Sequence, residues 1–177
     1  MTRSAPPRLT LGLVAAAFLA PFLIAAALRF GGWQPHQTRN YGFLLDPPQP
    51  MSAVVARSAT DGRVWVFENT EQAWTLLARI PPHCGVECRA LLETLQRVRT
   101  ALGRHAGRLH PFAIDPPPAG LAWPVLHLEG TLPEALSAAP ARLPEVWLVD
   151  PHGYLVLRYP EGFDPNGLRR DLSRLIK

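Results

Sequence analysis

The two cysteines are the residues whose type and spacing most clearly predict chemistry. Cys84 and Cys88 lie four positions apart and follow an apolar segment at residues 74–80. At positions i and i+4 of a helix, two side chains share one face. Cys84 would lie at or just before the helix N-terminus, where unpaired N–H groups and the helix dipole favour a thiolate. Because a thiolate is the nucleophile of disulfide exchange and a soft ligand for Cu(I), the pair predicts a redox or copper site.

A structural disulfide is the alternative interpretation of this pair. A disulfide between Cys84 and Cys88 would close a very small loop and add little stability. Three histidines are further candidates. His83 precedes the pair and would tune the thiolate or supply a copper ligand, whereas His127 and His152 are interpreted as strand-end and turn residues.

The elements that must position the cysteines alternate between strands and helices. A predicted helix carries an apolar stripe from Cys84 to Leu102 and ends at Gly103. A last helix begins at Pro165 or Asn166, and a short one covers residues 132–137. The last two of the expected strands form a hairpin, and the strands cover residues 64–67, 74–80, 109–114, 125–128, 145–149 and 154–159. The apolar face of the last helix consists of Leu168, Leu172, Leu175 and Ile176. This order predicts an α/β domain with a mixed sheet.

The N-terminal part predicts a membrane anchor. Residues 9–28 contain no charged side chain, and twenty helical residues span about 30 Å, the thickness of the bilayer core. Arg3 and Arg8 precede this block, so the positive-inside rule predicts a cytoplasmic N-terminus at residues 1–8 and an exported domain. A cleaved signal peptide ending near residues 25–27 is the alternative. Residues 29–52, rich in Gly and Pro, are expected to form a linker to a folded domain at residues 53–177.

The charge balance argues against nucleic-acid binding. The formal net charge is +4. Without residues 1–29 the chain keeps fifteen basic and fourteen acidic side chains, so its folded part has almost no net charge. A nucleic-acid-binding domain would concentrate Lys and Arg on that part.

The segment from Trp74 to Cys88, with a helix after it, resembles the Sco family. This resemblance implies a thioredoxin-like fold with a single transmembrane helix in the inner membrane and the soluble domain in the periplasm. It implies copper as the cofactor and a cytochrome c oxidase subunit, or another copper or thiol assembly factor, as the partner. Cys84, Cys88 and His83 would then be metal ligands. The sequence departs from the family at Gly85 and Arg89, where Sco motifs usually have Pro, and at Arg142, where the distal His is expected.

The segment from Leu143 to Gly153 is similar to the one that carries the cis-proline in TlpA/ResA-type thioredoxin-fold reductases. That similarity implies that Pro144 lies beside the cysteines as part of a catalytic site with Cys84 and Cys88. The sequence therefore predicts a membrane-anchored thioredoxin-like protein assisting cytochrome c oxidase assembly, by thiol–disulfide exchange, as an oxidoreductase, or by Cu(I) delivery. The alternative is a non-catalytic assembly or scaffold subunit with a structural disulfide.

Overall fold

A computed structural model describes residues 7–31, 40–81, 85–114, 123–137 and 144–177. The chain divides into two compact units, Met1–Thr38 and Arg39–Lys177. The buried residues of both hydrophobic cores of the second unit lie between Met51 and Ile176.

The described residues of the first unit form helix α1 (Pro7–Phe30) and the turn residue after it. Its residues Leu11–Phe30 have a mean hydropathy of 2.4 and are exposed along their length, so the helix is long and apolar enough to cross a membrane. Pro21 lies inside it. The helix predicted over residues 9–28 is therefore confirmed and is slightly longer at both ends.

The main sheet of the second unit has five strands in the order β1-β8-β7-β4-β5. β4 and β5 are parallel and are joined through helix α2, whereas β7 and β8 form an antiparallel hairpin that leads into helix α4. β7 pairs antiparallel with β4 and joins the two halves. The elements are β1 (Phe43–Pro50), β4 (Trp74–Arg79), α2 (Val86–Ala101), the 3-10 helix η1 (Gly103–Arg108), β5 (Leu109–Ala113), β7 (Glu145–Val149), β8 (Tyr154–Tyr159) and α4 (Pro165–Leu175).

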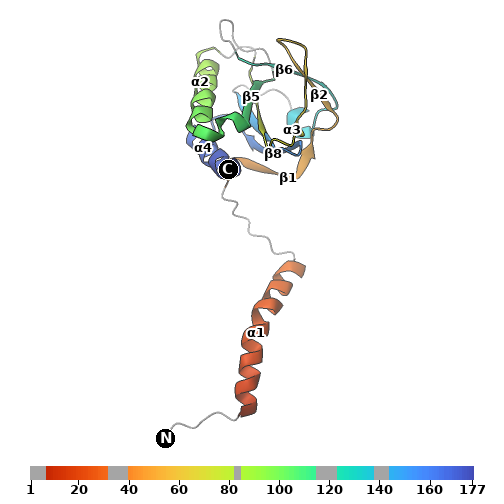
Figure 1. Ribbon diagram of the computed structural model, residues 1–177, viewed down its shortest axis with the longest axis vertical. Helices are drawn as coiled ribbons and strands as arrows, with labels where there is room; N and C mark the ends of the chain where they lie inside the picture. Colours follow the sequence, from red (N-terminus) through yellow and green to blue (C-terminus); the bar gives the residue numbers. More distant parts are fainter. Residues whose placement is uncertain (1–6, 32–39, 82–84, 115–122, 138–143) are drawn as a thin grey trace. The chain divides into compact units, whose positions relative to one another are not determined.

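Two helices cover one face of this sheet (Figure 1). Leu92 and Leu95 of α2 pack with Leu168 and Leu172 of α4 in one core cluster. Local signals start α4 and end α2 as their sequences predict. The Asp164 carboxylate accepts hydrogen bonds from the backbone N–H groups of residues 166 and 167, and α2 ends before Gly103, whose φ is +57°.

A smaller three-stranded sheet and a short helix cover the other face (Figure 1). The sheet order is β3-β2-β6, and the indole Nε1 of Trp65 donates to the hydroxyl oxygen of Thr75 at 3.2 Å, which ties it to β4. The elements are β2 (Val54–Ser58), β3 (Val64–Trp65), β6 (Leu126–Gly130) and α3 (Glu134–Ser137).

A buried carboxylate fastens the start of the second unit to its last helix. Oδ2 of Asp171 accepts hydrogen bonds from the N–H groups of Tyr41 and Gly42, at 2.8 and 3.0 Å, and from the Tyr159 hydroxyl at 3.0 Å. A Cβ on Gly42 would lie 2.6 Å from the Tyr159 ring, and one on Gly167 would lie 2.7 Å from Tyr41. We call Tyr41, Gly42, Tyr159, Gly167 and Asp171 the clamp. Burial, together with the negative charge of Asp171 beside the hydroxyl, raises the pKa of Tyr159 well above its usual range.

Three local predictions differ from the structure. Residues 43–50, predicted as part of an extended linker, form edge strand β1 and pair with β8. The strand predicted over residues 64–67 pairs only at Val64 and Trp65. Leu175, predicted on the apolar face of the last helix, is 39% exposed, because the buried face of α4 runs through Leu168 and Leu172 to Ile176.

Candidate redox site

The candidate site lies where β4 gives way to α2. Ile80 and Pro81 continue from β4 and are buried, and α2 begins at Val86. Gly85 precedes this helix and provides no side-chain cap, so the first N–H groups of α2 receive no side-chain hydrogen bond from it. An uncapped helix N-terminus favours negative charge beside it. The predictions for His83 and Cys84 fall on residues 82–84, outside the described residues.

Cys88 is the third residue of α2 and is fully buried. It packs in the core cluster with Leu92 and Leu95, as the predicted apolar stripe requires. Its sulfur is disulfide-bonded, and the described part of the chain contains no free thiol. A buried sulfur on the core side of the helix is inaccessible to another protein. Disulfide exchange must therefore take place at the other sulfur of the disulfide.

Pro144 lies at the same end of the sheet as the cysteine segment. β7 runs antiparallel to β4 and places Glu145 opposite Arg79, so continuing the register places Pro144 opposite Ile80. Pro144 is buried. The predicted cis bond joins Leu143 to Pro144, and Leu143 lies outside the described residues. The structure therefore brings Pro144 to the strand end from which the cysteine segment leaves.

His127 and His152 do not lie at the end of the sheet where Pro144 lies. His152 lies in the β7–β8 turn, beyond Val149. Val149 pairs with Thr75, which lies about 13 Å along β4 from Arg79. His127 is exposed on β6, opposite Arg57. Among the described residues, no group of three or more His, Cys, Asp or Glu side chains is arranged to hold a metal ion. Arg142, which stands at the place of the expected distal ligand, lies outside those residues.

A partly buried ion pair near the site was not predicted from the sequence. Glu145 is 3% exposed, and its carboxylate accepts a hydrogen bond from the Arg158 guanidinium. On the same strand, Trp147 lies under the Arg79 guanidinium, 5.0 Å from the ring centroid. Glu145 alternates with Val146, which packs in the cluster beside α2, so its side chain lies on the sheet face opposite Cys88. The sequence feature that could have predicted this ion pair is the presence of one acid and one arginine in two otherwise apolar hairpin strands.

The topology and the position of Cys88 define a class of protein. A β-α-β unit followed by a β-β-α unit, with a disulfide-bonded cysteine in the first turn of the first helix, is a thioredoxin-like arrangement. Residues 74–177 match the family model described as "Transmembrane-like, thioredoxin-like, C-terminal domain". The chain belongs to this family, and the thioredoxin-like fold expected from the sequence is confirmed.

Solved structures with similar folds are distant in sequence. Copper-bound ScoI of Arabidopsis thaliana is 16% identical, with a TM-score of 0.44 over 77% of this chain and 98% of that one. A putative electron transfer protein from Aquifex aeolicus VF5 is 15% identical, with a TM-score of 0.49 over 73% and 93%. Copper-bound ScoI of Bradyrhizobium japonicum is 17% identical, with a TM-score of 0.42 over 72% and 97%. A comparison with curated protein sequences finds no match.

Proposed function

We propose that this protein is a membrane-anchored, periplasmic thiol–disulfide oxidoreductase that keeps target cysteines reduced during cytochrome c oxidase assembly. The observation that carries the proposal is the disulfide-bonded Cys88 in the first turn of the helix that follows β4. Only one other cysteine, Cys84, exists in the chain, so we assign the pair as Cys84–Cys88. Helix α1 supports an anchor in the inner membrane, with residues 1–8 in the cytoplasm.

The proposed reaction uses the two sulfurs in sequence. In the reduced protein, the Cys84 thiolate attacks one sulfur of a target disulfide, which forms a mixed disulfide and releases one target thiolate. The Cys88 thiolate then attacks the Cys84 sulfur, closes the Cys84–Cys88 disulfide and releases the second target thiolate. The target gains two electrons and this protein loses two, so a separate dithiol reductant must return it to the reduced state.

The burial of Cys88 supports this division of roles. Its side chain has no exposed surface, whereas Cys84 precedes the uncapped start of α2, where a thiolate is favoured. Pro144, at the same end of the sheet, would border the site where the target segment binds.

Cu(I) delivery is the second candidate, with the metal as cargo. Two thiolates have the softness that Cu(I) requires, and His83, next to Cys84 in the sequence, would be the third ligand. Copper cannot bind to a closed disulfide, so this role needs the same reduction as the first. Thiol exchange needs only the two sulfurs, whereas this role also needs a third ligand.

Mixed-disulfide trapping in the full-length protein tests the proposal. Cys88→Ser and Cys84→Ser variants, reduced and reconstituted in lipid nanodiscs, are mixed with a disulfide-containing peptide, and adducts are counted by mass spectrometry. Cys88→Ser should accumulate the mixed disulfide because Cys84 attacks and no resolving thiol remains. Cys84→Ser should form at least tenfold less, because its one thiol is buried.

The opposite pattern would contradict these roles. Equal trapping in the two variants would mean that the burial of Cys88 does not control its reactivity. A wild-type disulfide that resists dithiothreitol in the folded protein would favour the scaffold alternative. Saturable 1:1 Cu(I) binding to the reduced wild type, lost in both variants, would favour the cargo role, and it should tighten in Arg142→His if that position is the distal ligand site.

A further inference from the structure

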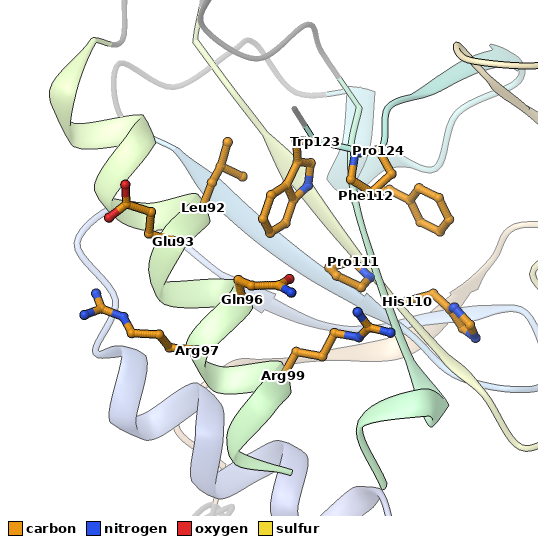
Figure 2. A pocket seen from close by; sticks show the side chains of 10 residues that line it. All are labelled: Leu92, Glu93, Gln96, Arg97, Arg99, His110, Pro111, Phe112, Trp123 and Pro124. Carbon is orange, nitrogen blue, oxygen red and sulfur yellow. The ribbon is translucent and has the colours of Figure 1, made fainter. Parts of the chain in front are cut away.

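A pocket of about 820 Å³ lies between α2 and β5, the edge strand of the main sheet (Figure 2). Pockets of this size accept whole small molecules. Its lining includes Leu92, Gln96 and Arg99 from α2, His110 and Pro111 from β5, and Trp123. None of these residues belongs to the candidate redox site, although Leu92 lies one helical turn after Cys88.

One end of the pocket is apolar and aromatic. Leu92 and Pro111 are buried, and the half-buried Trp123 lies near them in Figure 2. The indole Nε1 of Trp123 is buried and has no hydrogen-bond partner among the described residues. A buried donor without a partner is unusual, and its resonance can report on a ligand that enters this end of the pocket.

The other end of the pocket is cationic. Nε of Arg99 donates to the backbone oxygens of Ala106 and Leu109 at 3.2 and 3.0 Å, which fixes the guanidinium on the pocket wall. Figure 2 shows Arg99 extending from α2 toward β5, whereas Glu93 and Arg97, which also line the pocket and carry opposite charges, extend away from β5. No acidic side chain of the described residues forms an ion pair with Arg99.

The neighbouring histidine responds to the same charge. His110 is half-buried, and its pKa is lowered by burial and by the positive charge of Arg99, against a smaller opposing effect of Glu71. The neutral imidazole is thus favoured, and it adds no charge of its own at neutral pH. The pocket end between Arg99 and His110 therefore favours an anion.

An added β-strand is a poor occupant of this pocket. Pro111 offers no N–H at the outer edge of β5, and the backbone oxygen of Leu109 is already bonded to Arg99. The N–H of Ala113 donates to the oxygen of Pro124 at 2.9 Å. Because its outer donors and acceptors are blocked in this way, β5 cannot extend the sheet by pairing with a peptide.

We propose that this pocket binds a small aromatic monocarboxylate, with its carboxylate on the Arg99 guanidinium and its ring between Leu92, Pro111 and Trp123. An aromatic body suits the flat apolar walls, and one carboxylate matches one fixed guanidinium. This site is separate from the proposed thiol exchange and does not require either cysteine.

The test is a titration of the full-length protein in lipid nanodiscs with 2-naphthoate, followed by the indole N–H and His110 resonances in NMR spectra. Signals of the protein report binding even where the ligand also enters the lipid. We expect saturation, a shifted Trp123 indole resonance and a higher pKa for His110 in the complex, because the carboxylate offsets the charge of Arg99. The neutral analogue 2-naphthylmethanol should bind at least about tenfold more weakly.

Matched variants locate the anion. Arg99→Gln should weaken 2-naphthoate binding at least about tenfold, whereas Arg169→Gln, at an exposed position of α4 outside the pocket, should change it less than about twofold. Cys88→Ser should leave binding unchanged, which separates this proposal from the redox function. If Arg99→Gln does not fold, two measurements on the wild type still test the proposal: the relative affinity of the acid and the alcohol, and the change in the pKa of His110. Equal binding of acid and alcohol, decanoate binding as tightly as 2-naphthoate, or no saturable binding would overturn the proposal.

Discussion

Replacing Asp171 with alanine should cost more stability than any other single loss of a carboxylate in the described fold. The change leaves three donors of the clamp without their acceptor, namely the N–H groups of Tyr41 and Gly42 and the hydroxyl of Tyr159. Asp171 is 2% exposed, so water cannot replace the carboxylate freely. At about 1.5–3 kcal/mol for each bond to a charged acceptor, the free energy of unfolding should fall by about 4–9 kcal/mol.

Urea unfolding of residues 39–177, followed by circular dichroism, measures this loss. This fragment contains every residue of both hydrophobic cores. Asp171→Asn keeps an amide oxygen for the three donors and should lose less than half as much. Asp61→Ala is the matched control, because Asp61 lies in an exposed turn, where its ion pair with Arg63 at 3.2 Å is open to water, and the change should alter stability by less than about 1 kcal/mol.

A loss of less than about 1 kcal/mol for Asp171→Ala would refute the reasoning. It would mean that the segment before β1 detaches from α4 without unfolding the domain. A fragment starting at residue 43 would then be as stable as one starting at residue 39, whereas the clamp predicts that this shorter fragment is weakened as much as Asp171→Ala.

Two further predictions concern packing and pH. Leu172→Ala, at a fully buried position of α4, should lower the free energy of unfolding by about 2–5 kcal/mol, whereas Leu175→Ala, at a 39% exposed position, should lower it by less than about 1 kcal/mol, both measured by urea unfolding. The lowered pKa of His110 means that the unfolded chain binds this proton more readily than the folded one, so stability should fall as pH drops through the ordinary histidine value of 6.5. In His110→Phe, the free energy of unfolding should depend less on pH between pH 7.5 and 5.5. An unchanged pH slope would contradict the lowered pKa of His110.

The sequence predicted the parts of the fold that depend on local patterns. The apolar runs over residues 74–80 and 145–149 mark interior strands, and the stripe through Cys88, Leu92 and Leu95 marks α2. Asp150, at the hairpin turn, accepts hydrogen bonds from the N–H groups of His152 and Tyr154, as its turn sequence indicates.

The parts that sequence reasoning missed depend on contacts between distant segments. Residues 43–50 contain three prolines, which argue against a strand, yet an edge strand needs partners on only one side. The pairing of β1 with β8 also shifts register between Leu44 and Gln49, so the sequence of β1 has no regular alternation of apolar and polar residues. Asp171 looks like a surface acid of an amphipathic helix until Tyr41, 130 residues earlier in the chain, is placed beside it.

The clamp also determines where a mechanical load would enter the domain. A pull on the chain at Arg39 reaches the fold through the amides of Tyr41 and Gly42, and is shared there by α4 and by the ladder between β1 and β8. β4, which leads into the cysteine segment, is separated from β1 by β8 and β7. Tension on the linker would therefore strain the edge of the sheet and α4 first. It would reach Cys88 through the packing of α4 against α2 rather than through β4.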